Sequence, residues 1–393
     1  MPNKVERRLP SKKKTPKSPQ ERKKILIKIA LIAAVAIAVL ALLIWGIYHI
    51  AVDYYLGKIN YETKETGLVF ETQIIGETGT LGDTETITEE LPEKGVLPNI
   101  KDTDDVTNIL LLATDERFEN EASRSDTMIL VSINNKTKKI VLCSFMRDIL
   151  ASFPEDISSP VAGKLDKLTH AHAYGGAALT KAVLKETFNI DVQHHVRVNF
   201  YDFAKIIDAM GGLEVPLSAA EVDVINDYAS RNDDENKGLG TTADDFIVNK
   251  GKGVYLLNGI QAVHHARNRT IGSDWGRTQR QRQILELTLT KMSSLSLTQV
   301  MNFFEVVLPL VTTNMPKQLL KDMVGDILKY ANYERVSTRV PENGSYSEEK
   351  YNIIVFPENI YRLYEEIYGY PAENDPRYAA SENTTAETAT KEN

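Results

Sequence analysis

The sequence predicts an α/β protein whose central mixed sheet is covered by helices on both faces, preceded by a single N-terminal transmembrane helix. Two observations predict this α-β-α sandwich: short, continuous apolar runs typical of buried strands recur along the chain, and amphipathic segments of helical length separate them. A third observation, one long uncharged apolar run at residues 29–50, predicts the membrane helix.

The composition is that of a folded protein with one large domain or two medium ones. The chain has 393 residues, of which 42% are apolar and 25% charged, and this excludes a wholly disordered chain. Its only cysteine, Cys143, excludes a disulfide scaffold, and the apolar run around it predicts a buried thiol. The net charge of −8 argues against general binding of nucleic acid, which needs a basic face.

A basic segment precedes the apolar run. Residues 1–28 contain eleven Lys or Arg and two Glu, a net charge of +9, so the rest of the chain carries −17. Alone, this segment could be an arm that binds nucleic acid. The 22 uncharged residues that follow it are, as a helix, long enough to cross the ~30 Å hydrocarbon core of a bilayer. A buried core helix would contain polar interruptions, and a cleaved signal peptide would have a shorter apolar region.

The basic flank also predicts the topology, because Lys and Arg next to a membrane helix stay in the cytoplasm. We therefore expect residues 1–28 to be a cytoplasmic tail, 29–50 an uncleaved signal anchor, and the rest extracellular. Residues 53–105, rich in Thr, Glu and Gly, are predicted to be a linker or a small accessory region. Residues 106–372 form the predicted folded domain, and 373–393 a disordered tail with almost no large apolar residue at its end.

The strands of the folded domain are predicted in order from the apolar runs. Residues 108–113, 127–133 and 139–145 are the first three, and the polar segment 134–136 fits a tight connection between the second and the third. Further strands are predicted at residues 194–200, 213–217 and 351–356.

Helices are predicted between and after these strands. Residues 168–188 carry an apolar stripe, and residues 202–212 form a shorter helix that glycines terminate. Residues 259–266 start another predicted helix, and further helices are predicted at residues 277–292 and, with a proline in its first turn, 357–368.

Charged residues gather where the first three strands end or begin. Asp115 follows the first strand directly, Arg124 and Asp126 come at the start of the second, and Arg147 follows the third. Ligands of α/β proteins bind at strand ends. Several residues of mixed charge at one edge of the sheet therefore predict a charged ligand.

A second group is rich in arginine. Arg267 and Arg269, two residues apart, share a face if that segment is extended. Arg277 and Gln281, four apart, share a face in the first turns of the following helix, whose N-terminus adds partial positive charge. Guanidinium groups match phosphate oxygens in bidentate fashion, so this group predicts a phosphate-bearing ligand.

The two carboxylates extend the prediction to phosphoryl transfer. Magnesium commonly takes one or two carboxylates together with substrate phosphates, and Asp115 and Asp126 could supply them. Carboxylates, magnesium and arginines together are the usual equipment for phosphoryl transfer. Arg280 and Arg282 fit a solvated basic helix face equally well.

Seven motifs in order carry a family resemblance: NILLLATD-x-R (108–117), RSDTMIL (124–130), FMRD (145–148), KLDKLTHAHAYGG (164–176), FxxxIDAMGGLEV (203–215), LNGIQAVHHARNR (257–269) and DWGRTQRQRQ (274–283). Over about residues 105–295 the chain resembles the LytR-CpsA-Psr family. The resemblance implies a cell-wall phosphotransferase of mainly Gram-positive bacteria. Such enzymes move a glycopolymer, such as wall teichoic acid or capsule, from a polyprenyl-pyrophosphate carrier to the primary hydroxyl of N-acetylmuramic acid in peptidoglycan.

The resemblance also implies the site. Asp115 and Asp126 would hold magnesium, or manganese in its place, and would be catalytic together with Arg267 and Arg269. The residues implied to hold the pyrophosphate are Arg124, Arg147, Arg267, Arg269, Arg277, Gln281 and Lys164. The lipid tail would enter an apolar pocket between sheet and helices, and no nucleic-acid partner is expected. The implied location is the cell membrane, with the catalytic domain outside.

The chain departs from the family pattern at uncharged positions. Ala113 stands where glycine is usual, Met146 where proline is usual, and His265 where tyrosine is common. Thr169 and His170 stand where an Asn-Ala pair is common. These departures leave every charged residue of the pattern in place and bear on the shape of the pocket and the choice of donor.

Three other functions remain open. The histidine pairs around residues 170–172, 194–195 and 264–265 could indicate a zinc hydrolase, but the HExxH motif is absent. A membrane-anchored transcription attenuator would need a DNA-reading element, and the short basic tail offers electrostatic binding at best. A binder of lipid-linked pyrophosphate glycans, non-catalytic or hydrolytic, would use the same arginines.

Overall fold

The computed structural model describes ten segments of the chain, residues 50–62, 104–115, 123–157, 161–231, 239–242, 245–249, 251–293, 295–349, 352–372 and 374–375. The chain divides into two compact units, residues 1–54 and 55–393. The predicted cytoplasmic tail, all but the last residue of the predicted signal anchor, and most of the predicted C-terminal tail lie outside the described segments. Within those segments, no helix has the length and apolar character needed to cross a membrane.

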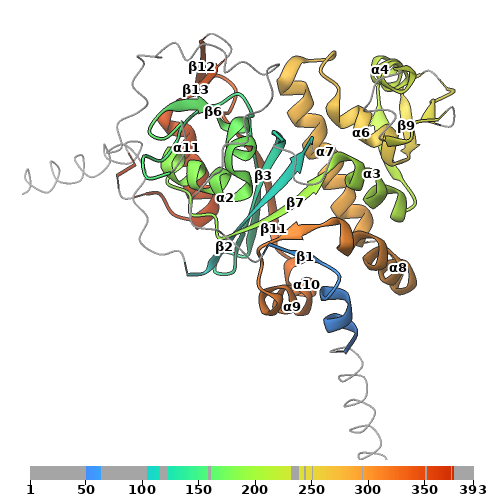
Figure 1. Cartoon of the computed structure of the whole chain (residues 1–393), viewed down its shortest axis with the longest axis horizontal. Helices are drawn as coiled ribbons and strands as arrows, with labels where there is room; N and C mark the ends of the chain where they lie inside the picture. The colour runs from blue at the N-terminus through green and yellow to red at the C-terminus, as the bar shows by residue number, and fades with distance from the viewer. Residues whose placement is uncertain are drawn as a thin grey trace, which may run out of the picture. The chain divides into compact units, whose positions relative to one another are not determined.

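The second unit is built on a seven-stranded mixed sheet (Figure 1). Three neighbouring pairs of its strands are parallel and three are antiparallel, as the predicted mixed sheet requires. In spatial order the strands are β1 (Asn60–Tyr61), β10 (Thr312–Thr313), β7 (His194–Asn199), β2 (Val106–Thr114), β3 (Ser125–Asn134), β4 (Lys139–Phe145) and β11 (Glu334–Val340).

One face of this sheet is covered by α2 (Leu168–Phe188) and α11 (Pro357–Tyr368). Leu110, Leu130 and Cys143, from three adjacent strands, are completely buried beneath them. The prediction of a buried thiol is confirmed, and burial raises the pKa of Cys143. The thiol therefore acts as a small apolar packing group.

The opposite face is covered by α9 (Lys317–Gly325) and α10 (Ile327–Tyr330). Ile109 and Ile133 point to this side, together with Met315 and Tyr333. Ile109 and Leu110 are consecutive, and successive side chains of a strand point to opposite faces. Helices thus flank both faces of the sheet, and the predicted layers are confirmed.

A second core lies among helices and a small hairpin. Its elements are α3 (Phe200–Ala209), β8 (Leu213–Leu217), α4 (Ala219–Ser230), β9 (Gly253–Leu257), α6 (Gly259–Arg267), α7 (Ser273–Ser293) and α8 (Leu297–Val307). The close approach of α3 and α6 explains Gly259, because a Cβ there would lie 2.0 Å from the carbonyl oxygen of Ala204. Of these elements, α4, β9 and α8 were not predicted.

The connection between β3 and β4 has the predicted tight form. The Asn134 side chain accepts hydrogen bonds from the backbone N–H groups of Lys136 and Thr137, each at 2.9 Å. Its amide group donates to the carbonyl of Ile367 in α11 at 2.9 Å, so the same residue also ties the turn to the helix layer.

Helix α2 is not the uninterrupted helix predicted for residues 168–188. Gly175 and Gly176 have non-helical backbone angles, φ −160° and ψ 26° for the first, φ 61° and ψ −155° for the second. The combination at Gly176 is open essentially to glycine alone. The kink separates the first turns of α2, which begin beside β5 (Leu150–Ser152) and β6 (Leu165–Lys167), from the rest of the helix.

Candidate active site

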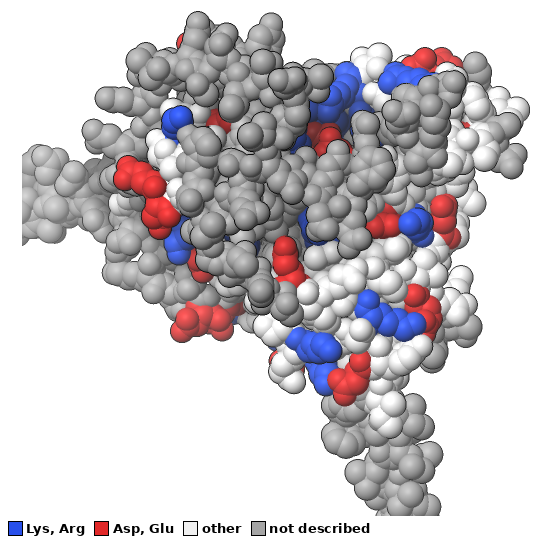
Figure 2. All heavy atoms as spheres, viewed as in Figure 1, with Lys and Arg blue, Asp and Glu red and all other residues white. Residues whose placement is uncertain are grey.

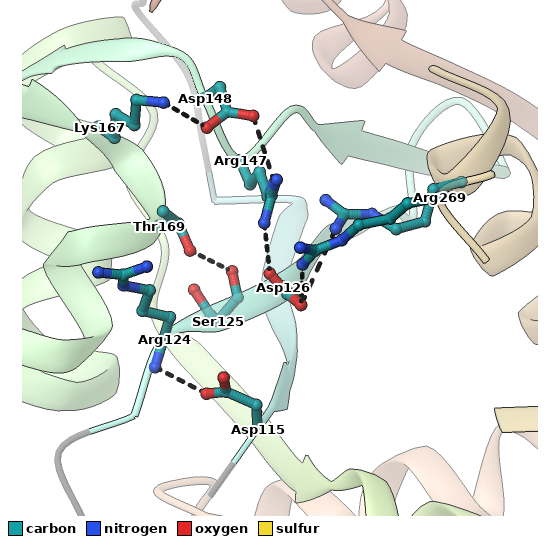
Figure 3. Close-up of polar contacts among 10 residues, drawn as sticks. Asp115, Arg124, Ser125, Asp126, Arg147, Asp148, Lys167, Thr169 and Arg269 are labelled. Carbon is teal, nitrogen blue, oxygen red and sulfur yellow. Dashed lines mark hydrogen bonds and ion pairs between the residues drawn. The ribbon is translucent and has the colours of Figure 1, made fainter. Parts of the chain in front are cut away.

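The antiparallel pairing of β2 and β3 brings two of the predicted carboxylates to one end of the sheet. β2 ends at Thr114 and β3 begins at Ser125, so Asp115 and Asp126 lie close together there (Figure 3). A backbone hydrogen bond joins the segments just beyond β2 and just before β3, in which the Asp115 N–H donates to the Arg124 carbonyl at 3.3 Å. The Arg124 N–H in turn donates to Oδ1 of Asp115 at 3.0 Å.

Asp126 is the centre of an arginine cluster. Its Oδ1 lies 3.2 Å from Nη1 of Arg147, and its Oδ2 lies 3.1 Å from Nη2 of Arg269 and 3.9 Å from Nη1 of Arg277. The three arginines come from three places: after β4, after α6, and within α7. The structure therefore brings these predicted residues together around the Asp126 carboxylate, which is 9% exposed.

Helix α7 supplies the buried part of the cluster. The Arg277 side chain is only 2% exposed, and Gln281 lies one turn further along the same helix, also buried. The Gln281 amide nitrogen has no hydrogen-bond partner among the described residues. A buried polar group of this kind is available to a ligand that enters beside Arg277.

Two residues outside the predicted set extend the cluster. Asp148 accepts from Nε of Arg147 at 3.2 Å and from Nζ of Lys167 at 2.8 Å, so it holds Arg147 in the orientation that faces Asp126. The FMRD motif contained the signal for Asp148, since the acid directly follows the arginine. The KLDKLTH segment contained Lys167.

Lys164, which the resemblance implies at the pyrophosphate, is exposed just before β6. In the part of the chain that the structure describes, its side chain makes no hydrogen bond or ion pair with the cluster around Asp126. Lys167, three residues later, is joined to the cluster through Asp148.

Arg267 and Arg269 reach different carboxylates rather than sharing one face. α6 ends with Arg267, and the extended backbone begins only at Asn268, with φ −56° and ψ 120°. The Arg267 guanidinium lies 4.7 Å from the centre of the Phe200 ring and acts electrostatically on Asp115, whereas Arg269 pairs with Asp126. Each carboxylate therefore has its own arginine from this segment.

Arg280 and Arg282 are structural rather than a solvated basic face. Arg280 is buried and donates to the carbonyls of Asn268 and Ile271, which fixes the loop that carries Arg269. Arg282 donates to the carbonyl of Thr338 at 3.0 Å and so ties α7 to β11. Arg280 and Arg282 thus position the cluster indirectly, by holding the loop that carries Arg269 and the helix that carries Arg277.

The two aspartates have opposite electrostatic environments. Burial raises the pKa of Asp126, but Arg277, Arg269 and Arg147 together lower it further, so the net pKa lies below the usual range. Burial and the nearby Asp126 charge raise the pKa of Asp115, and the Arg124 N–H and Arg267 only partly oppose them. A cation near Asp115 would relieve this repulsion.

The residues present fit magnesium bound jointly with a substrate. The Asp115 carboxylate, whose Oδ1 accepts the Arg124 N–H, lies close to the Asp126 carboxylate at this end of the sheet. Among the described residues, no group of three or more His, Cys, Asp or Glu could hold a metal by itself, and this applies to the histidine pairs considered for zinc. One or two carboxylates completed by phosphate oxygens is the usual arrangement for Mg²⁺.

The cluster carries a local excess of positive charge. Five cations, Arg147, Lys167, Arg267, Arg269 and Arg277, lie around the three carboxylates Asp115, Asp126 and Asp148, a surplus of two. On the face drawn in Figure 2, described acidic and basic side chains are interspersed over the surface. The surplus is therefore a property of the site, suited to a small polyanion such as a pyrophosphate.

Comparison with known proteins finds relatives among transferases. A polyisoprenyl-teichoic acid–peptidoglycan teichoic acid transferase TagU from Enterococcus faecalis is 32% identical over 219 residues, 55% of this chain and 62% of that protein. The protein of the same name from Oceanobacillus iheyensis is 29% identical over 278 residues, 68% of this chain and 77% of that protein. The chain thus spans less than two thirds of the Enterococcus relative.

A solved structure and a family profile extend the comparison. The structure described as TagT bound to LI-WTA superposes with a TM-score of 0.51 at 25% identity, over 71% of this chain and 98% of that chain. The profile of the LytR_cpsA_psr family matches residues 76–366, which is most of the sequence. The resemblance seen in the seven motifs is confirmed, and the chain belongs to the LytR_cpsA_psr family.

Proposed function

We propose that this protein is a membrane-anchored phosphotransferase that moves a glycopolymer from a polyprenyl-pyrophosphate carrier to the N-acetylmuramic acid hydroxyl of peptidoglycan. The observation that carries the proposal is the Asp126 cluster, in which three arginines from separate elements converge on one carboxylate. Two phosphates with two or three negative charges match its surplus of positive charge and its fork-shaped donors.

The relatives support the substrate class. Two of them carry names that specify transfer of teichoic acid from a polyisoprenyl carrier to peptidoglycan, and the structural relative is described as bound to LI-WTA. Teichoic acid, capsule or a similar polymer is therefore the proposed cargo of this chain.

The arginines differ in what they would do. Arg269 is half exposed and so can leave Asp126 for a phosphate, whereas Arg277 is buried and fixed. Negative charge develops on the departing polyprenyl phosphate, and guanidinium groups already in place stabilise it without reorganisation. Magnesium held by Asp115 and Asp126 would add further positive charge at the phosphates.

The proposed location follows from the sequence. The uncharged residues 29–50 would anchor the protein, and the basic residues 1–28 would keep that end in the cytoplasm. The catalytic domain would then lie outside, on the side of the membrane where peptidoglycan and its lipid-linked donors meet. Gram-positive envelopes have this arrangement.

A transfer assay with the full chain in lipid nanodiscs tests the proposal. The donor is a synthetic polyprenyl-pyrophosphate glycan, the acceptor is a peptidoglycan oligomer, and mass spectrometry detects the phosphodiester-linked product with magnesium or with chelator. We expect Arg269→Ala to lower the transfer rate about 10²–10³-fold, as for loss of one charge-stabilising donor. Arg231→Ala, which removes an exposed arginine of α4's C-terminal end, should leave the rate unchanged.

Two outcomes would overturn the proposal. Release of polyprenyl phosphate without product, with several acceptors, would identify a hydrolase. Tight donor binding without any turnover, for two different donor glycans, would identify a binding protein.

A further inference from the structure

The beginning of α2 carries a histidine–aspartate pair. Nδ1 of His170 lies 2.9 Å from Oδ1 of Asp166, which belongs to β6. Asp166 is itself fixed, because Oδ1 also accepts from the N–H of Lys167 at 2.7 Å and Oδ2 accepts from the Tyr174 hydroxyl at 3.0 Å. The imidazole ring is therefore held by a carboxylate that three hydrogen bonds orient.

The state of Asp166 determines the tautomer of His170. Burial raises the pKa of Asp166, but the hydrogen bonds from His170, Lys167 and Tyr174 lower it further, so the carboxylate is ionised at neutral pH. An ionised carboxylate only accepts hydrogen bonds, so Nδ1 of His170 carries the proton. Nε2 is then the ring nitrogen through which His170 can accept a proton, on a side chain that is 22% exposed.

The pair borders the arginine cluster. Thr169, next to His170, donates its N–H to the Arg147 carbonyl at 3.1 Å and its hydroxyl to the Ser125 carbonyl at 2.9 Å (Figure 3). Ser125 directly precedes Asp126. Thr169, the residue before His170, therefore contacts the backbone of Arg147 and of Ser125, two segments that supply residues of the cluster.

The Arg124 side of the site connects to the same pair. In Figure 3 the Arg124 side chain runs towards α2 rather than towards Asp126, and its charge acts on Tyr174. Among the described residues, His170 contacts Asp166 from β6 and Tyr174 from α2, and Arg124, directly before β3, acts electrostatically on Tyr174.

The other titratable groups of the site are poor proton acceptors. Asp126 is bound by three arginines, which lower its pKa, and Asp115 is the expected ligand of the metal. His172, two residues after His170, is buried, bonds to the Ser123 carbonyl and has a pKa lowered to about 4 by burial.

We infer that His170, oriented by Asp166, is the general base that activates the acceptor hydroxyl in the transfer reaction proposed above, on which this inference rests. The hydroxyl oxygen forms a bond to the phosphorus that bears the glycan, and its proton passes to Nε2 of His170. The bond from that phosphorus to the bridging oxygen breaks, and its electron pair leaves with the polyprenyl phosphate. His170 then releases the proton to solvent.

The test compares transfer rate, pH profile and donor affinity in the full chain in nanodiscs. His170→Gln should lower the saturated transfer rate about 10²–10⁴-fold, the usual worth of a general base, without changing the dissociation constant of the donor. The fall in wild-type rate towards acid pH should disappear in this variant. Asp166→Asn should lower the rate as well, because an amide no longer fixes the tautomer.

Two controls keep a structural effect apart from a catalytic one. Lys185→Gln, at an exposed position on the same helix, should keep the wild-type rate and profile. Added imidazole should restore part of the rate to His170→Ala, which a merely misfolded protein would not show. A wild-type rate in His170→Gln, or an equal loss of donor affinity and rate, would overturn the inference.

The wild type and the His170→Gln variant together distinguish failure of the proposed function from failure of this inference. If the wild type binds donor and transfers nothing, the phosphotransferase proposal fails, and the base inference fails with it. If the wild type transfers and the His170→Gln variant does too, only the inference fails.

Discussion

Asp126 and Asp115 differ in what their charges do to stability. Asp126 is ionised among three arginines, one of which is 2% exposed. Asp126→Asn removes the buried carboxylate that Arg147, Arg269 and Arg277 share, so we expect the free energy of unfolding to fall by about 3–5 kcal/mol at pH 7. The pKa of Asp126 is lower in the folded protein than the value of about 3.9 in the unfolded chain. The stability that the Asp126 charge contributes is therefore present above about pH 3.9 and is lost as pH falls through the folded pKa.

Thermal melting of wild type and Asp126→Asn between pH 7 and pH 2 measures this effect. The difference in melting temperature should be large at pH 7 and shrink below about pH 4. Asp227→Asn, which breaks an exposed ion pair with Arg231, is the matched control and should change stability by less than about 0.5 kcal/mol. A difference that stays constant down to pH 2 would show that the carboxylate charge is not the cause.

Asp115→Asn should act in the opposite direction. Its raised pKa means that the ionised form is less stable in the folded protein, so stability is present at low pH and is lost as pH rises through the folded pKa. The variant should melt above the wild type at pH 7 and equal it in acid, while its transfer rate falls about 10²–10³-fold. A lower melting temperature at pH 7 would contradict this reading of Asp115.

The sequence predicted most of the site at this scale, and the exceptions have physical reasons. Strand ends and arginine spacing identified Asp115, Asp126, Arg147 and Arg269, which the fold brings together. Lys167 could not be singled out by spacing alone, because Lys164 lies just before the three-residue strand β6 and Lys167 ends it. The contacts of Arg280 depend on a loop conformation that no local pattern reveals.

At the scale of elements, several segments with strong local signals were predicted with their bounds, whereas the helices α4 and α8 and the shortest strands were not. The strand at residues 139–145 and the helices at residues 168–188 and 357–368 have the predicted bounds, since apolar periodicity and a proline at the first turn are local signals. β1 and β10 have two residues each and depend on tertiary pairing. The kink in α2 was missed because glycine within a helical pattern does not specify its backbone angles.

That kink predicts a cost for one substitution. Gly176→Ala places a side chain on a backbone conformation with φ 61° and ψ −155°, although no atom lies within 4 Å of the new Cβ. We expect a loss of about 1–3 kcal/mol from backbone strain alone. Since the kink directly follows Tyr174 and lies about one and a half turns after His170, the transfer rate should fall as well.

Thermal melting and the transfer assay measure the two effects of Gly176→Ala. Gly325→Ala is the matched control, because it also meets no atom within 4 Å and its backbone is not in the left-handed region. It should be neutral or slightly stabilising, since alanine restricts the unfolded chain. Equal melting temperatures for both variants would show that α2 relaxes without the kink.

At the scale of the whole molecule, the distribution of charge is the strongest constraint. Residues 1–28 carry +9 and the remainder −17, on either side of the uncharged residues 29–50. The acidic remainder nevertheless contains a site with surplus positive charge. A positively charged site within an otherwise acidic part of the chain favours selective binding of a polyanion over binding to a generally basic surface.

The same asymmetry predicts the topology, and the single cysteine makes it measurable. Cys143 is completely buried, so a membrane-impermeant maleimide should leave the natural chain unlabelled in intact cells. Lys252→Cys, at an exposed position next to β9, should be labelled from outside, and Ser11→Cys only after the membrane is opened. Labelling of Ser11→Cys in intact cells would place the basic segment outside, where lysines and arginines beside an anchor are not retained. The catalytic domain would then be separated from peptidoglycan, and the proposed acceptor would be wrong.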